Sequence, residues 1–347
     1  MAKKRPTRAT SHDVARLAGV SQAAVSRAFS AGSSISKDKR ERVLKAAHEL
    51  HYVPNKLASS LSTARSNMVA VIVGNLNNPF YSESLQAFVT GFQESGRQVL
   101  AFSVTDAADG DEVVQQAVYY PVDAIVVTAA PLSSKLLKIS AGLGIPIVMF
   151  NRHLDSNRIA GVHCDNRGAG ARIAEAMHSA GAERFLIVRG DPEGSTSRDR
   201  VEGFRTYLLA RGVPPTGIEE IDGASSYGAS RDSLRARFRA GDRPRPDAIY
   251  AVSDIMALGC LDALRTDLGL RVPGDVMLAG SDGIRQGRLS AYDLTTIRQP
   301  IEQMVATTLQ MLESAEDLKN PDMIQVLELP GEFIPGSTVP RPPRDKP

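Results

Sequence analysis

Polar side chains that could hold a small molecule recur directly after apolar segments of this sequence. If these segments are parallel strands, the side chains meet beyond the carboxyl ends of the strands, where open α/β sheets bind ligands. Any one of them alone would suit a helix cap or a turn, so the predicted site rests on their shared placement. The candidates are Asn75, Asn77 and Asn78 before Pro79, Phe80 and Tyr81; Asn151 and Arg152; Asp165 and Asn166; Arg200; Ser253 and Asp254; and Ser281 and Asp282.

The chemistry of these residues favours binding a polyhydroxylated compound over transforming one. Arginine donors and aspartate acceptors suit hydroxyl groups, and Phe80 and Tyr81 could cover an apolar face. The sequence has no Walker loop, HExxH or GxSxG motif, and its six histidines show no metal spacing. We therefore expect no enzyme activity, no cofactor and no metal.

Two weaker signals leave this expectation unchanged. The segment GAGARI, residues 168–173, places Ile173 where a dinucleotide fingerprint has its third glycine, and helix packing explains it as well as phosphate binding would. Cys164 and Cys260 lie far apart within apolar segments, so they form neither a disulfide framework nor a zinc motif. We expect both thiols to be inert core residues in a reducing cytoplasm.

A second set of side chains could contact DNA. Residues 13–29, DVARLAGVSQAAVSRAF, predict two short amphipathic helices that meet at a tight turn. Thr10 and Asp13 form a capping-box-like start, Gly19 permits the turn, and Ser21 can cap the second helix. The apolar positions expected inside are Val14, Leu17 and Ala18; Ala24, Val25, Ala28 and Phe29; and Val43, Leu44, Ala47 and Leu50 of a third helix that starts at Ser36.

Three short helices with a glycine-containing turn predict a helix-turn-helix head. The second helix leaves Gln22, Ser26 and Arg27 facing outward, available to base edges and phosphates. Charge supports this, because residues 1–65 hold thirteen Lys and Arg against four Asp and Glu, whereas the remainder is mildly acidic. A basic head on an acidic body is typical of a nucleic-acid-binding module.

From Met68 onward, apolar segments alternate with helical patterns, including 80–95, 166–180, 198–211 and 254–267. This alternation predicts parallel α/β sheets covered on both faces, and the number of strands favours two lobes. No apolar run approaches the roughly 18 residues of a membrane span, and the basic N-terminus lacks the apolar core of a secretory signal. The candidate strands are MVAVIVGN, QVLAFSV, AIVVTA, PIVMFN, AGVHCD, RFLIVRG, AIYAVSD, VMLAGSD and LTTIRQ.

These motifs together resemble the lac repressor family of bacterial transcription regulators. Residues 12–30 are similar to the family's head, and residues 52–61, YVPNKLASSL, are similar to its hinge helix. The resemblance covers nearly the whole chain, in order, through NPFY, DNRGAG, STSRDRVEGF, SDIMALG, LGLRVPGDVMLAGSD and LTTIRQP.

The resemblance implies a homodimer whose recognition helices enter two major-groove half-sites of a near-palindromic operator. Gln22 and Ala23 would be the main sequence readers, with Gln22 on an adenine and Ala23 on a thymine methyl. Arg27 would reach a guanine or a phosphate, and Ser21 and Ser26 would make positioning contacts.

The resemblance also implies a switch in the hinge, where Asn55, Ala58 and Leu61 match the family's motif. Leu61 corresponds to a leucine wedge that enters the minor groove and kinks the operator. Pro54 suits a helix start, but the segment is too short to form a stable helix alone. We expect it to become helical only when docked on DNA; an ordinary linker is the alternative.

The core resembles periplasmic sugar-binding proteins, whose two lobes close on a ligand. Arg200 and Asp282 match the family's most regular effector contacts, and an effector would control operator affinity through its differential affinity for two lobe arrangements. Arg152, Arg198 and Arg200 make a sugar acid or a phosphorylated sugar plausible beside a neutral sugar. The remaining predicted effector contacts are Phe80, Tyr81, Asn151, Arg152 and Ser253.

The predicted organisation is a helix-turn-helix domain at 1–52, a hinge helix and linker at 53–66, a two-lobed effector-binding and dimerisation core at 67–340, and a loose tail at 341–347. Lobe 1 comprises about 67–165 and 298–328, and lobe 2 comprises 166–297 and 329–340. The sequence departs from the family pattern at Ala24, Ser30 and Pro335, each of which puts one contact in doubt. The tail has no counterpart of the lac repressor's tetramerisation helix, which favours a dimer.

The sequence thus predicts a sequence-specific transcriptional regulator, a repressor in most relatives, that acts in the cytoplasm on the nucleoid without a membrane partner. Its partners would be double-stranded operator DNA, a second copy of the chain and a small-molecule effector. A transport-type solute-binding protein would have the same core, but the basic head and the missing export signal argue against it. An α/β enzyme with an unrelated N-terminal extension is the third alternative.

Overall fold

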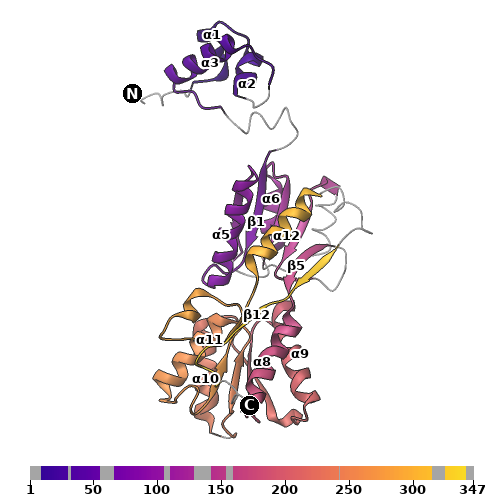
Figure 1. Cartoon of the computed structure of the whole chain (residues 1–347), viewed down its shortest axis with the longest axis vertical. Helices are drawn as coiled ribbons and strands as arrows, with labels where there is room; N and C mark the ends of the chain where they lie inside the picture. The colour runs from indigo at the N-terminus through magenta and orange to yellow at the C-terminus, as the bar shows by residue number, and fades with distance from the viewer. Residues whose placement is uncertain are drawn as a thin grey trace, which may run out of the picture. The chain divides into compact units, whose positions relative to one another are not determined.

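The computed structural model of the chain describes residues 9–29, 33–54, 66–104, 110–128, 142–153, 159–241, 243–314 and 325–340. The chain divides into two compact units, Met1–Ser66 and Asn67–Pro347. Figure 1 shows the first unit as three short helices and the second as an α/β body in which helices and strands alternate. No helix among these ranges is both long and apolar enough to cross a bilayer.

The N-terminal unit contains helices α1 (Ser11–Ala18), α2 (Gln22–Phe29) and α3 (Lys37–Glu49). The predicted capping box is confirmed, since Asp13 N donates to Thr10 Oγ1 at 3.3 Å and Thr10 N donates to Asp13 Oδ2 at 3.0 Å. Gly19 ends α1 in the left-handed conformation, with φ 63°, which a residue with a side chain adopts at a cost. The backbone can therefore turn sharply into α2.

The core of this unit is narrower than the sequence predicted. Val14, Val25 and Val43 are at most 1% exposed, but Leu17 is 49% exposed and Leu44 is 44% exposed, so their predicted burial was wrong. The buried positions of α3 are Val43, Ala46 and Ala47, and Leu44 lies about a quarter of a turn away from that stripe. Helices of 8 and 13 residues in so small a unit bury one stripe each. The lesser deviations are Phe29, 37% exposed with its ring 5.9 Å from Tyr52, and Leu50, which is half-buried.

The first lobe of the second unit is a six-stranded parallel sheet in the order β11-β5-β4-β3-β1-β2. Because strand residues alternate between the two faces, Val69 and Val71 pack with α5 and α12, while Ala70 and Ile72 pack with α6. The elements are β1 (Met68–Val73), α5 (Pro79–Glu94), β2 (Gln98–Ser103), α6 (Gly110–Val118), β3 (Ala124–Val127), β4 (Ile147–Phe150), β5 (Ala160–Cys164), α12 (Ile301–Glu313) and β11 (Val326–Leu329).

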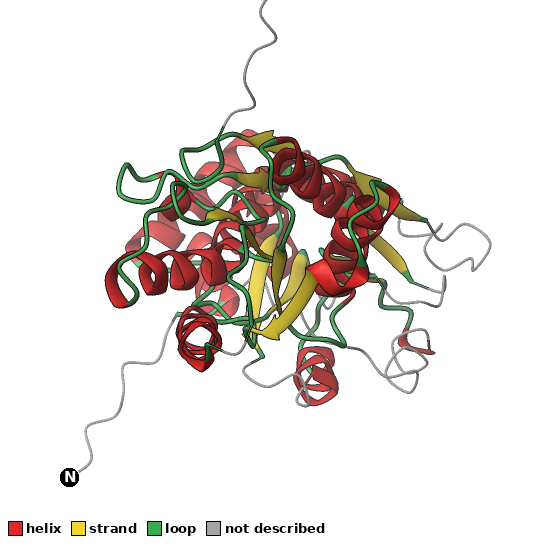
Figure 2. Cartoon of the chain, turned by 90° about the horizontal axis from the view of Figure 1, so that it is seen from below, coloured by secondary structure: helices red, strands yellow, loops and turns green. Residues whose placement is uncertain are grey.

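The second lobe is a four-stranded parallel sheet in the order β7-β6-β8-β9. Figure 2 shows helices lying outside the strands, as expected for covered parallel sheets. Helix α11 continues into a short π-helical turn at Ala263–Asp267. The elements are α8 (Asn166–Ser179), β6 (Phe185–Arg189), α9 (Ser195–Ala210), β7 (Ile218–Asp222), α10 (Tyr227–Ala240), β8 (Ala248–Ala251), α11 (Asp254–Asp262) and β9 (Met277–Ala279).

An antiparallel ribbon of β10 (Thr296–Arg298) and β12 (Glu332–Ile334) lies between the two lobes (Figure 1). The prediction that LTTIRQ is a strand was right for its centre, but this strand belongs to neither parallel sheet. Strands β7, β11 and β12 were not predicted, because short edge strands such as IEEID in β7 carry charges that hide the apolar pattern.

Candidate functional site

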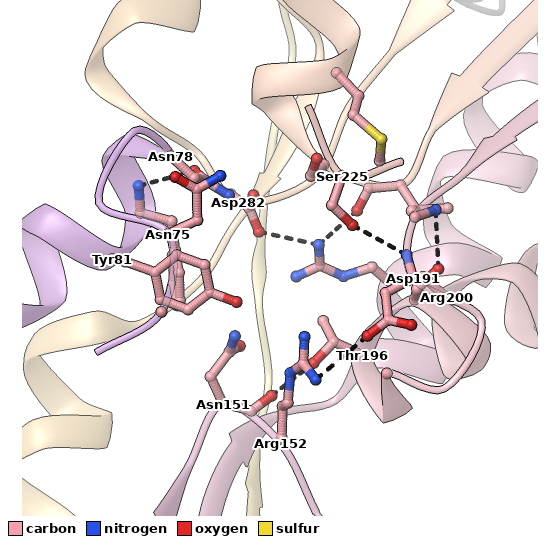
Figure 3. A pocket seen from close by; sticks show the side chains of 18 of the residues that line it. Asn75, Asn78, Tyr81, Asn151, Arg152, Asp191, Thr196, Arg200, Ser225 and Asp282 are labelled. Carbon is pink, nitrogen blue, oxygen red and sulfur yellow. Dashed lines mark hydrogen bonds and ion pairs between the residues drawn. The ribbon is translucent and has the colours of Figure 1, made fainter. Parts of the chain in front are cut away.

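A cavity of about 460 Å³ lies between the two lobes of the second unit, where the carboxyl ends of their strands face one another. The first lobe contributes the loops after β1 and β4, and the second contributes the loops after β6, β7 and β8 (Figure 3). The structure brings together on this cavity every effector contact that the resemblance implied: Phe80, Tyr81, Asn151, Arg152, Arg200, Ser253 and Asp282.

Arg200, in the second turn of α9, is buried at the floor of the cavity. Its Nε donates to Asn166 Oδ1 at 2.9 Å, and its Nη1 donates to Val252 O at 2.6 Å and to Asp282 Oδ1 at 2.9 Å. Burial is the largest single influence on the pKa of Arg200 and lowers it, but the charge of Asp282, the weaker effects of Tyr250 and Cys164 and the hydrogen bond to Asp282 together leave the pKa above the ordinary value. The guanidinium is thus charged and fixed before any ligand arrives.

Asp282 has a backbone φ of 141°, a strained conformation for a residue with a side chain, so the surrounding structure must hold it there. Its Oδ1 accepts from Arg200 and, at 2.9 Å, from Gln299 Nε2. Burial raises the pKa of the Asp282 carboxyl, while Arg200 opposes that rise. Both of these bonds end on Oδ1, so they hold the carboxylate in place at the cavity.

Asp254 lies behind Asp282 and does not line the cavity. It accepts from Thr296 Oγ1 at 2.6 Å, Gly283 N at 2.7 Å and Ile284 N at 3.0 Å. Burial, and after it the neighbouring charge of Asp282, raises the pKa of Asp254 to about 7. Asp254 therefore ties β10 to the loop that carries Asp282, a positioning role that the strand-end pattern did not reveal.

Three buried polar atoms at the cavity have no hydrogen-bond partner among the described residues: Asn151 Oδ1, Arg152 Nε and Ser253 Oγ. An unsatisfied buried polar group costs about 1 to 3 kcal/mol. Asn151 is also held at φ 67°, with its carbonyl accepting from Thr196 Oγ1 at 2.7 Å. Polar atoms left unpaired on a cavity wall indicate a polar ligand.

Two aromatic rings come from the start of α5. Asn78 caps this helix, since its Oδ1 accepts from Phe80 N at 3.1 Å, and Pro79 occupies the first helical position. The rings of Phe80 and Tyr81 meet edge to face at 5.4 Å, and Figure 3 shows the Tyr81 ring at the cavity. The Asn-Pro-Phe-Tyr segment thus places a ring surface opposite Arg200.

Several strand-end candidates do not reach the cavity, because they support its walls instead. Asp165 Oδ1 caps α8 by accepting from Gly168 N at 2.8 Å, and Ser281 Oγ bonds the hydroxyl of Tyr250 at 2.8 Å. Asn77 donates its backbone N–H to Asn75 Oδ1 at 3.0 Å. Arg198 is exposed on α9 and is not among the lining residues.

Sequence reasoning missed other lining residues: Asp191, Thr196, Ser197, Asp222 and Ser225. Asp222 ends β7 and Ser225 follows it, and this strand was not predicted. The others lie in the segment RGDPEGSTSRDR, whose first residues follow a predicted strand and could have been included.

The GAGARI segment serves helix packing. A Cβ on Gly170 would lie 2.1 Å from Arg200 O, and one on Gly203 would lie 2.0 Å from Arg167 O. These two glycines let α8 and α9 approach closely, which holds Arg200 in place. Within the described ranges, no three His, Cys, Asp or Glu side chains are placed to hold a metal ion. Burial raises the pKa of Cys164 to about 11 and of Cys260 to about 12, which makes both thiols poor nucleophiles.

The candidate DNA-reading face lies on the N-terminal unit. Helix α2 buries Ala24, Val25 and Ala28 and exposes every predicted contact in the described part: Ser21, Gln22, Ala23, Ser26 and Arg27. The predicted hinge contacts Asn55, Ala58 and Leu61 lie outside the described residues.

Local bonds hold this face in position. Ser21 Oγ caps α2 by accepting from Ala24 N at 3.3 Å, and Gln22 Nε2 donates to Ser11 Oγ at 2.8 Å. Arg27 and Lys39 line a hollow of about 380 Å³ together with the serines Ser21, Ser34 and Ser36. Two cations beside hydroxyl donors suit a phosphate, and Lys39, Ser34 and Ser36 had escaped sequence reasoning.

Comparisons with known proteins find relatives of both units of the chain. Residues 10–55 match the model of bacterial regulatory proteins of the lacI family, and residues 174–339 match the periplasmic binding protein-like domain. The ribose operon repressor of Halalkalibacterium halodurans is 30% identical over 94% of this chain and 95% of its own length. The regulator DegA of Bacillus subtilis is 32% identical over 86% of this chain and 88% of its own length.

Solved structures confirm the fold. The lac repressor dimer bound to operator and the anti-inducer ONPF superposes with a TM-score of 0.84 at 23% identity, covering 96% of this chain and 99% of that one. The complex of the regulator CelR with cellobiose gives 0.67 at 26% identity, covering 95% and 100%. The predicted helix-turn-helix head and two-sheet α/β core are thus confirmed, and the chain belongs to the lacI family of bacterial regulatory proteins, which are DNA-binding transcriptional regulators.

Proposed function

We propose that this chain is a homodimeric repressor that binds a near-palindromic operator and releases or grips it in response to a small polyhydroxylated effector. The observation that carries the proposal is that α2 has one buried apolar face and one exposed polar face. Ala24, Val25 and Ala28 are buried, whereas the residues around them are exposed on one unit rich in basic side chains. A stable helix with an exposed polar face of this kind suits insertion into a major groove.

The effector would bind in the interlobe cavity. Arg200 and Asp282 would orient the hydroxyl groups of the effector. The unpaired Asn151 Oδ1 and Ser253 Oγ would form hydrogen bonds with it. Relatives include repressors of a ribose and a sucrose operon and a regulator solved with cellobiose, which supports a sugar here. We propose ligand binding without catalysis at this cavity, since the relatives are regulators and not enzymes.

The proposal keeps the predicted organisation. Residues 1–52 read the operator, 53–66 form the hinge with Asn55, Ala58 and the Leu61 wedge, and 67–340 hold the effector and the dimer contacts. Binding of the effector would change the angle between the lobes and so the spacing of the two hinge segments. The regulator would act in the cytoplasm, on the nucleoid.

Operator binding by the full-length chain tests this proposal. A duplex selected from a random pool should be palindromic, and its affinity should fall steeply with salt. Arg27→Ala should weaken binding by about 1 to 3 kcal/mol if Arg27 reads a base, or lower the salt slope by about one if it contacts a phosphate. Arg16→Ala, on exposed α1 beside Asp13, is the matched control and should bind nearly as the wild type does.

Two results would contradict the proposal. One is a selection that yields no preferred duplex over scrambled competitor at moderate salt. The other is unchanged footprinting by both Arg27→Ala and Leu61→Ala, which would remove the assigned reading helix and wedge.

A further inference from the structure

The arginines of the effector cavity are already neutralised, which bears on the charge of the ligand. The sequence alone left a neutral sugar, a sugar acid and a phosphorylated sugar open, because three arginines lie near the cleft. Arg198 does not line the cavity. Arg200 bonds Asp282 at 2.9 Å, and Arg152 lies 3.6 Å from Asp191. Every lining arginine in the described part of the chain therefore has a carboxylate partner.

From this pairing we infer that the effector is an uncharged polyhydroxylated compound, and that carboxylated or phosphorylated forms of the same compound bind much more weakly. The inference rests on the proposed effector role of this cavity. The charges of the residues that line the cavity narrow the class of ligand that this site can bind.

Carboxylates outnumber guanidinium groups on the described wall. Asp191, Asp222 and Asp282 line the cavity with only two arginines, and Asp222 takes its own partner, Arg189, at 3.8 Å. An anion placed between these groups would meet several negative charges at short range, in a partly desolvated space where screening is weak. It would also compete with Asp282 for Arg200, whose Nη1 already donates to that carboxylate.

The polar atoms left over suit hydroxyl groups. Asn151 Oδ1 accepts only, Ser253 Oγ donates or accepts, and Arg152 Nε donates. A hydroxyl can serve each of these, since it is both donor and acceptor, whereas a carboxylate or phosphate oxygen that lies against Asn151 accepts only and would leave Asn151 Oδ1 unpaired. Specificity then comes partly from the groups that an anion leaves unsatisfied.

The Arg152–Asp191 pair is the point where the charge preference can be changed. At 3.6 Å the pair is loose, and Asp191 is also held through its backbone, whose N–H donates to Ser225 Oγ at 3.0 Å. Replacing Asp191 by Asn removes the partner of Arg152 while the loop keeps this bond. Replacing Asp222 by Asn removes the same charge from the same wall without freeing Arg152, so it is the matched control.

The test uses thermal shifts of the full-length chain with matched pairs: ribose and ribose 5-phosphate, glucose and glucose 6-phosphate, galactose and galactonate, cellobiose and cellobionate. At least one neutral member should stabilise the protein, with about tenfold or greater preference over its anionic counterpart. Asp191→Asn should narrow that preference severalfold, and Asp222→Asn should narrow it less.

An anionic member that stabilises the wild type as well as its neutral partner would overturn the inference. The effector role of the cavity would still stand if Asp282→Asn abolished that shift. A neutral hit whose shift survives both Arg200→Met and Asp282→Asn would instead overturn the proposed site. Equal effects of Asp191→Asn and Asp222→Asn would overturn the part assigned to Arg152.

Discussion

The reading face of α2 and the effector cavity use polar side chains in opposite ways. Gln22, Ser26 and Arg27 are exposed, and the bonds of Gln22 to Ser11 and of Arg27 to Ala23 O stay within α1 and α2. Arg200, Asp282 and Asp254 are buried and bonded to residues far away in the sequence. An exposed polar face costs little free energy of folding, because water solvates its side chains until DNA replaces that water. A buried ionic network must be satisfied by the protein itself, so its members contribute to stability and specificity together.

The largest effect that separates the two regions should come from Arg200→Met. Removing one partner of a buried ion pair leaves Asp282 uncompensated, which typically costs about 3 to 5 kcal/mol in the free energy of unfolding. Urea unfolding followed by circular dichroism measures this loss. Arg198→Met, on the exposed side of the same helix, should stay within about 0.5 kcal/mol. Similar losses in both variants would break the contrast between buried and exposed arginines.

The next effect tests the narrow core of the N-terminal unit. Val25→Ala empties a fully packed position and should destabilise the three helices by about 1 to 3 kcal/mol. Leu17→Ala removes a larger side chain, but it is half exposed and should cost less than about 1 kcal/mol. Hydrogen exchange of the α1, α2 and α3 amides gives both values. The reverse order would show that Leu17 is packed after all.

A smaller effect, dependent on pH, should come from Asp254. Its pKa of about 7 in the folded chain lies above the ordinary 3.8. The folded state therefore binds the proton more tightly, so this group's contribution to stability is complete below about pH 3.8 and is lost as the pH rises to about 7. Asp254→Asn should flatten that decline by on the order of 1 kcal/mol or more, measured as the difference in urea midpoints between pH 5 and pH 8. Parallel pH profiles of variant and wild type would refute this origin.

The smallest effect on stability should come from the reading face. Gln22→Ala removes one exposed bond to Ser11 and should change the free energy of unfolding by no more than about 0.5 kcal/mol. The same variant should lose about 1 to 3 kcal/mol of discrimination at one operator position. Competition between the selected duplex and singly substituted duplexes measures that loss. A Gln22→Ala protein that unfolds easily would show the reading face to be structural.

Local patterns were enough to predict much of both regions. The capping box at Thr10, the turn at Gly19 and the strands from Met68 to Phe150 depend on neighbouring residues and on apolar periodicity, so they can be identified in one dimension. Failures occurred where the pattern is short or charged. Glu219 and Glu220 interrupt the apolar pattern of the edge strand β7, so this strand was not predicted. Asp222 and Ser225, which lie at its end and after it, were therefore not predicted as cavity residues.

The sequence by itself determined the family, the basic head and the parallel α/β core. It also placed Arg200 near the start of a helix and Asp282 after a strand, because each of these depends on residue type and spacing. The tertiary structure alone decided which of the polar strand ends face the cavity and which carry its walls. It also decided that Arg152 and Arg200 each lie beside a carboxylate. Arg152 and Asp191 are 39 residues apart and come from different lobes, whereas Arg200 and Asp282 are 82 residues apart and come from different elements of the second lobe. Both pairs form only in the folded chain, and no local pattern encodes them.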